Sequence, residues 1–157
     1  MPLSPVFAGR SNRSRCQRHR SKSKKVKPNG GTLLTQAQFT ILRKHGTEPP
    51  GSSPLNHEQR KGTFACAGCG LPLFSSETKF ESNTGWPSFN QPLPDAVGTS
   101  EDRSFLISRT EVHCRRCGGH LGHVFNDGPL PTGLRYCING LALKFIPDPP
   151  VRSDITR

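Results

Sequence analysis

The chain contains two Cys-x-x-Cys pairs, and their spacing constrains its fold more than any other feature. The pairs are Cys66–Cys69 and Cys114–Cys117, and residues 70–113 separate them. Each pair can present two thiolates from one tight turn, and two such turns complete the tetrahedral sulfur shell of a structural zinc site. Zinc ribbons that bind nucleic acid usually separate their pairs by only about 15–20 residues. We therefore predict that the metal joins two β-hairpins of a larger domain.

Two other interpretations of these four cysteines stay open from the sequence. They could be redox-active dithiols, but neither pair lies in the strand–helix–strand pattern of a thioredoxin-like motif. They could form structural disulfides, but those belong to oxidising compartments, and the N-terminal residues lack the pattern of a secretory signal. Four thiolates would leave no open position on the metal, so we expect its role to be structural.

The composition excludes a helical bundle or a coiled coil and favours short strands. Only 31% of the residues are hydrophobic, and the chain contains 16 Gly and 15 Pro. Bundles and coiled coils need regular apolar positions and few helix-breaking residues. No run approaches the roughly 18 consecutive apolar residues of a membrane-spanning helix. We therefore predict a mainly β fold with many turns and no membrane segment.

The first 31 residues differ in composition from the rest. They hold nine of the 22 Lys and Arg residues and none of the 11 acidic ones, so most of the net charge of +11 belongs to them. High charge with few apolar residues predicts a disordered basic tail over residues 1–31. This tail could be a targeting segment, a solvated tail, an arm that attracts nucleic acid, or an over-long gene start. We expect a cytoplasmic protein, with organelle targeting through residues 1–31 as the alternative.

A short helix is predicted where the folded part begins. Thr35 and Gln38 have the capping-box pattern, in which each side chain accepts a hydrogen bond from the other residue's backbone N–H. Gly46 is the residue type that commonly ends a helix, so we expect the helix to stop there. The proline-rich segment 48–54 should then be an extended loop.

Three segments further along the chain have the patterns of strands. They are rich in β-branched or aromatic residues, or alternate apolar and polar side chains, and they cover residues 104–113, 121–125 and 135–146. Segment 128–133 contains two glycines and two prolines and is a predicted loop.

Cys137 belongs to neither pair, and Cys16 is the only other such cysteine and falls in the basic tail. A cysteine in a strand is more often an inert apolar residue than a nucleophile. Arg135 stands two residues before it and could favour the thiolate, which is the reactive form. Cys137 is therefore a candidate nucleophile, with a packed and unreactive thiol as the alternative.

Two histidines and the only tryptophan are the other candidates for chemistry. His120 and His123 lie three residues apart between glycines. They could be metal ligands, ordinary strand residues, or proton donors that face Cys137, because the pKa of imidazole lies near neutral pH. Trp86 could pack in the core beside a turn, or it could form the aromatic wall of a ligand pocket.

Five motifs occur together in one order along the chain. They are Cys66-x-x-Cys69, Gly85-Trp86-Pro87-Ser88-Phe89, Cys114-x-x-Cys117, His120-Leu121-Gly122-His123-Val124-Phe125 and Arg135-Tyr136-Cys137-Ile138-Asn139. The set resembles the B-type peptide methionine sulfoxide reductases, which reduce the R epimer of methionine sulfoxide. The resemblance implies two small antiparallel sheets with short N-terminal helices, held together by one zinc ion on four cysteines. It places the catalytic domain at residues 32–150 and a C-terminal tail at 151–157.

The resemblance also implies roles for named residues. The Cys137 thiolate would attack the sulfoxide sulfur, and His120 and His123 would protonate the departing oxygen. The expected site comprises the catalytic residues Cys137, His120, His123 and Asn139, the substrate-binding residues Trp86, Phe125 and Arg135, and the zinc ligands Cys66, Cys69, Cys114 and Cys117. The cysteine would become a sulfenic acid, which a reductant has to restore.

The chain departs from the family where many members carry a second, resolving cysteine. Residues 81–84, just before the Gly-Trp-Pro motif, contain none. The sulfenic acid should then be reduced by an external thiol, by a thioredoxin-type protein, or by Cys16 on the tail. We expect a monomer whose partners are polypeptides that contain methionine sulfoxide and a thiol reductant. The rival hypotheses are a zinc-dependent nucleic-acid-binding module and an inactive zinc scaffold.

Overall fold

The computed structural model describes residues 33–150, so the predictions for the basic tail, for Cys16 and for residues 151–157 lie outside the described part. Within it there are one α-helix, nine strands and four short 3-10 helices. None of these described helices is long and apolar enough to cross a membrane.

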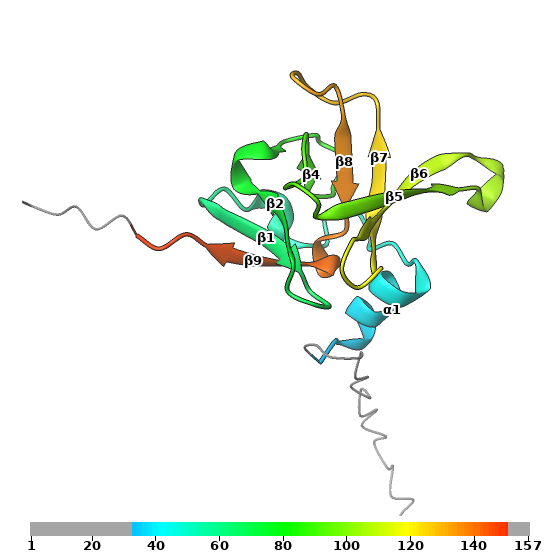
Figure 1. Cartoon of the computed structure of the whole chain (residues 1–157), viewed down its shortest axis with the longest axis horizontal. Coiled ribbons are helices and arrows are strands. Elements are labelled where there is room, and N and C mark those ends of the chain that lie inside the picture. The colour runs from blue at the N-terminus through cyan, green and yellow to red at the C-terminus, as the bar shows by residue number, and fades with distance from the viewer. Residues whose placement is uncertain (1–32, 151–157) are drawn as a thin grey trace, which may run out of the picture.

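The strands form two antiparallel sheets (Figure 1), which confirms the predicted mainly β fold. The smaller sheet has the strand order β2-β1-β9, and the larger has the order β3-β4-β8-β7-β6-β5. The strands are β1 Gly62–Cys66, β2 Pro72–Ser75, β3 Lys79–Phe80, β4 Ser88–Phe89, β5 Val97–Asp102, β6 Arg109–Cys114, β7 His120–Phe125, β8 Arg135–Ile138 and β9 Leu143–Pro147. The 3-10 helices are η1 Pro54–His57, η2 Ser76–Thr78, η3 Ser104–Leu106 and η4 Gly140–Ala142.

Aromatic residues from both sheets form the core. Phe74 of β2 stacks on Phe89 of β4 with ring centroids 4.4 Å apart, and Phe64 of β1 meets Phe89 edge-on at 5.0 Å. All three rings are fully buried, and each contributes about 1.5–3 kcal/mol through burial alone. Ile138 of β8 is also buried in this core, and side chains alternate along a strand, so the neighbouring Cys137 faces the other side of the sheet.

The helix α1 (Gln36–Lys44) has the predicted capping box at Thr35 and Gln38. Its end differs slightly from the prediction, because His45 and not Gly46 takes the left-handed conformation, with φ 53°. The imidazole of His45 contacts the carboxylate of Glu111 on β6 at 3.0 Å. The helix buries Ile41 and Leu42 and packs against β7 and η4.

The predicted strand over residues 104–113 is wrong in its first half. β6 begins only at Arg109, and η3 occupies the end of the β5–β6 hairpin. Phe105 and Leu106 have φ angles of 59° and 61°, which no strand residue adopts. Their apolar character indicated a strand, but the chain has to reverse here because β5, which sequence analysis did not identify, pairs with β6.

The predicted strand over residues 135–146 is two strands in different sheets. β8 ends at Ile138 and β9 begins at Leu143, with η4 between them. The carboxylate of Glu48 accepts hydrogen bonds from the backbone N–H groups of Gly140 and Leu141, at 2.7 and 2.9 Å, and this fixes the turn. The strand over 121–125 is confirmed within β7, and 128–133 is a loop as predicted.

Candidate active site and metal centre

The four paired cysteines meet between the two sheets. Cys66 and Cys69 lie at the turn between β1 and β2, and Cys114 and Cys117 lie at the turn between β6 and β7. Their sulfur atoms all lie within 4.8 Å of one another, with 3.7 Å from Cys66 to Cys117 and 3.5 Å from Cys69 to Cys114. A disulfide requires about 2.05 Å, whereas sulfurs on one tetrahedral zinc lie about 3.8 Å apart. The cluster therefore fits a metal ion, and it joins two hairpins as predicted.

A cavity of about 130 Å³ lies on the face of the large sheet that is turned away from the aromatic core. Its lining consists of Thr47, Trp86, Arg109, Gly122, His123, Phe125, Cys137 and Asn139. Five residues that sequence analysis selected for the active site thus lie around one cavity. His120 and Arg135, which were also selected, do not line it.

Cys137 is placed in the cavity by the pairing of β7 with β8, where it lies directly opposite His123. Gly122 allows this close approach, because a Cβ there would overlap the carbonyl oxygen of Cys137. Burial raises the pKa of the Cys137 thiol, and the charge of Arg135 and a hydrogen bond with Thr84 lower it only in part. Arg135 therefore acts in the predicted direction, but it does not make Cys137 a thiolate at neutral pH.

Arg135 contacts the residues around the cavity and not the cavity itself. Its guanidinium donates two hydrogen bonds to the carboxylate of Asp127, at 2.9 and 3.0 Å, and lies 4.5 Å from the ring centroid of Phe125. Phe125 lines the cavity, so Arg135 holds this wall in place and ties it to the loop that follows β7.

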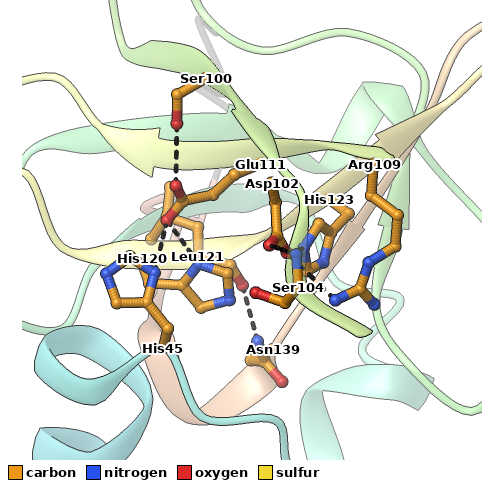
Figure 2. A network of polar contacts seen from close by, with 10 residues as sticks. All are labelled: His45, Ser100, Asp102, Ser104, Arg109, Glu111, His120, Leu121, His123 and Asn139. Atoms are coloured by element: carbon orange, nitrogen blue, oxygen red, sulfur yellow. Dashed lines mark hydrogen bonds and ion pairs between the residues drawn. The ribbon is translucent and has the colours of Figure 1, made fainter. Parts of the chain in front are cut away.

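His123 on β7 is oriented by an acid on β5, which lies two strands away in the large sheet. Its Nε2 lies 2.8 Å from Oδ2 of Asp102, and the same oxygen accepts a hydrogen bond from Arg109 at 3.0 Å (Figure 2). Hydrogen bonds from Ser104 and His123 hold the pKa of Asp102 well below its usual range. A permanently charged carboxylate therefore fixes the orientation of the imidazole that faces Cys137.

His120 lies behind His123, with ring centroids 5.4 Å apart. Its Nδ1 donates to Oε1 of Glu111 at 2.7 Å, and the other oxygen of Glu111 accepts from Ser100 at 2.8 Å (Figure 2). His120 is buried, and its Nε2 has no hydrogen-bond partner among the described residues. Burial also lowers the pKa of His120, so its imidazole is neutral at neutral pH with an unpaired Nε2.

Glu48 connects three parts of the site, and sequence analysis gave it no role. Its backbone N–H donates to Oδ1 of Asn139 at 3.0 Å, and its carbonyl oxygen accepts from the indole of Trp86 at 3.0 Å. Nδ2 of Asn139 also donates to the carbonyl oxygen of Leu121 at 2.9 Å. Asn139 and Trp86 are therefore held by one buried residue, whose side chain fixes the turn after β8.

Comparison with known proteins decides the family. The SelR domain matches residues 34–147, which is most of the described structure. The chain belongs to the SelR family. Within it, the peptide methionine sulfoxide reductase MsrB of Leptospira interrogans is 58% identical over 113 residues, which cover 71% of this chain and 86% of that protein. The MsrB proteins of Methanosarcina barkeri and Methanosarcina mazei are 55% and 52% identical, over 72% and 80% of this chain and 80% and 90% of theirs.

SelR membership confirms the predicted resemblance to the B-type reductases and the predicted enzyme class, an oxidoreductase. Sequence motifs identified most of the cavity wall and all four cysteines of the metal cluster. They did not identify Asp102, Arg109, Glu111 or Glu48, because these residues stand outside the five motifs. Charged side chains at such places carry no local pattern that separates them from ordinary surface residues.

Proposed function

We propose that this chain reduces methionine (R)-sulfoxide in peptides and proteins to methionine, with Cys137 as the nucleophile. The observation that carries the proposal is one cavity that holds the thiol of Cys137, the imidazole of His123 and the indole of Trp86. Family membership supplies the reaction class, since relatives that are 58% and 55% identical are named peptide methionine sulfoxide reductases.

The raised pKa of Cys137 bears directly on the mechanism. At neutral pH the cysteine enters as a thiol, so the proton that the sulfoxide oxygen needs is already present in the cavity. We propose that His123 takes this proton and gives it to the oxygen, so that one imidazole acts first as a base and then as an acid. No external proton is required for this step.

The atoms balance in the following way. The sulfur of Cys137 bonds to the sulfoxide sulfur, the oxygen is protonated, and the bond between the sulfoxide sulfur and oxygen breaks. The bond between the two sulfurs then breaks as the hydroxyl moves to the sulfur of Cys137, so that thiol and sulfoxide become sulfenic acid and thioether. Methionine sulfur gains two electrons and Cys137 loses two.

The remaining site residues would position these groups. Asp102 fixes the ring of His123, and Glu111 fixes the buried ring of His120 behind it. Both the oxygen and the nitrogen of the Asn139 side-chain amide are hydrogen-bonded to the backbone, to Glu48 and Leu121. Asn139 would therefore hold the part of the cavity wall that follows β8 in place. We propose that Trp86 and Phe125 receive the methyl end of the substrate, which leaves the oxygen of one epimer facing His123.

Recovery of the thiol requires a reductant from outside the cavity. No second cysteine lines it, and the other four described cysteines belong to the metal cluster. One external thiol would displace water from the sulfenic acid to form a mixed disulfide, and a second would release Cys137. A thioredoxin-type protein or a small thiol fits this role.

We propose that the metal is zinc, because four thiolates in this geometry are its usual structural site. Zinc supplies no step of the reaction here, since a closed sulfur shell leaves no position for a substrate. Cys66, Cys69, Cys114 and Cys117 would hold it and thereby join the two sheets.

The test is turnover of a peptide with a single methionine sulfoxide, with its two epimers resolved by chromatography. The wild-type protein with dithiothreitol should consume the R epimer only, and Cys137→Ser should abolish this while still binding one zinc. Consumption of the S epimer, or full activity of Cys137→Ser, would refute the proposal. Comparison of thioredoxin with dithiothreitol would identify the class of reductant.

A further inference from the structure

The exposed apolar side chains of the described structure are concentrated on two loops. Large hydrophobic residues with high exposure are Leu33, Phe105, Leu106, Ile107, Leu130 and Ile146. Four of the six lie between β5 and β6 or between β7 and β8. Three are consecutive, with Phe105 86%, Leu106 104% and Ile107 62% exposed. A chain with so few apolar residues gains nothing in stability by exposing three together.

Both loops leave the large sheet beside the active-site cavity. The strand register pairs Asp102 with Arg109 and Phe125 with Arg135, while Thr110 pairs with Val124, so Arg109 lies next to Phe125. Arg109 and Phe125 both line the cavity. Figure 1 shows the β5–β6 hairpin projecting from the body of the molecule.

The turn that presents the apolar residues is built with unfavourable backbone conformations. Phe105 and Leu106 are both left-handed, a region that favours glycine or asparagine over bulky side chains. Asp102 stabilises the start of the turn, because its Oδ1 accepts the backbone N–H of Ser104 at 2.9 Å. Its other oxygen binds His123 and Arg109, so one carboxylate links this turn to the cavity.

Arg109 offers a second sign that a ligand extends in this direction. Its Nε is buried and has no hydrogen-bond partner among the described residues. The Arg109 side chain as a whole is 33% exposed, and Arg109 is part of the cavity wall. Its guanidinium can therefore donate a hydrogen bond to a peptide carbonyl next to a sulfoxide in the cavity.

We propose that Phe105, Leu106 and Ile107 form a docking surface for apolar side chains that flank the oxidised methionine of an extended polypeptide. The inference rests on the proposed function and specifies its substrate class. Methionine is mostly buried in folded proteins, so its sulfoxide becomes accessible when a chain unfolds and exposes its apolar neighbours. The loop leads directly into β6, whose first residue, Arg109, lines the cavity, so one extended polypeptide can contact both.

The test uses two heptapeptides with a central methionine (R)-sulfoxide, flanked by leucine and phenylalanine in one and by serine and glycine in the other. The triple variant Phe105→Ser/Leu106→Ser/Ile107→Ser and the single variant Leu106→Ser are compared with Ile146→Ser, an exposed residue of the other sheet. Dithiothreitol serves as reductant so that no protein reductant has to dock.

The triple variant should lower kcat/KM for the apolar-flanked peptide about tenfold, mostly through KM, because about one apolar side chain's burial is lost. Leu106→Ser should give a smaller loss, while Ile146→Ser and the polar-flanked peptide should show none. An equal loss for both peptides, or no loss, would overturn the proposal. A change in oligomeric state with unchanged peptide selectivity would assign the surface to self-association and would also overturn it.

A binding measurement tests the docking surface independently of the proposed function. A fluorescent, unoxidised form of the apolar-flanked peptide needs no chemistry, and its anisotropy should report weaker binding to the triple variant than to the wild type. If the wild type reduces neither peptide, the proposed function fails, and the anisotropy still decides whether the surface binds apolar peptides. Equal anisotropy for the two proteins would count against docking even in an active enzyme.

Discussion

Glu48→Gln should destabilise the protein and also disturb its active site, because Glu48 connects Asn139, Trp86 and the turn after β8. The Glu48 side chain is only 2% exposed, and its two carboxylate oxygens accept from the backbone N–H groups of Gly140 and Leu141. Glutamine has nearly the same shape but only one oxygen. Its amide group would therefore face one of these N–H groups, and donor would meet donor.

The expected size of the effect follows from these two contacts. One buried N–H loses its acceptor, at a cost of about 1–3 kcal/mol. The second keeps an acceptor but loses its charge, which lowers the strength of that hydrogen bond by about 1 kcal/mol. We expect the free energy of unfolding to fall by about 2–4 kcal/mol. Glu77→Gln is the control, since Glu77 is exposed and its carboxylate makes no hydrogen bond with another described residue, so its effect should stay within about 0.5 kcal/mol.

Urea unfolding of the metal-bound protein measures the free energy of unfolding, with fluorescence of the single tryptophan as the signal. The same preparations should show a lower kcat/KM for methionine sulfoxide, because the backbone of Glu48 holds both Trp86 and Asn139. If Glu48→Gln unfolds at the same urea concentration as Glu77→Gln and keeps full activity, the connecting role of Glu48 is wrong.

Three further predictions concern the chemistry and the metal. Glu111→Gln should lower kcat at least about tenfold with KM unchanged, because the amide of glutamine no longer fixes the tautomer of the buried His120. Steady-state kinetics measure both constants, and an unchanged kcat would contradict this role of Glu111. The rate of Cys137 alkylation by iodoacetamide should rise with pH around a midpoint above that of a free thiol, because burial raises the pKa of Cys137. Arg135→Ala should move this midpoint further up, because the charge of Arg135 lowers the pKa of Cys137 in the wild type. A midpoint that moves down would count against that reasoning. Cys69→Ser should abolish metal binding measured by native mass spectrometry and should lower the urea midpoint; equal stability would exclude a structural metal.

Local signals in the sequence predicted the parts of the fold that are locally determined. The capping box at Thr35 predicted the start of α1, and the two Cys-x-x-Cys pairs predicted a cluster that joins two hairpins. Local signals also identified the five cavity residues, because these stand in short motifs on β7, on or directly after β8, and in the loop before β4.

Features that depend on tertiary pairing could not be read in the same way. The apolar segment 104–107 has strand composition, yet it is a turn because Asp102 pairs with Arg109 across the hairpin. The break after Ile138 depends on the carboxylate of Glu48, which is 92 positions away from Gly140. Asp102 and Glu111 reach His123 and His120 across the sheet, from β5 and β6 to β7.

The metal cluster has a consequence for how this protein would respond to oxidants. Cys114 and Cys117 belong to the turn that leads directly into His120, and the backbone N–H of Cys114 donates to the carbonyl of Gly119 at 2.8 Å. Peroxide that oxidises these thiolates would release the ion and loosen the start of β7 together with the imidazoles it carries. The proposed activity would then depend on an intact cluster as well as on a reduced Cys137.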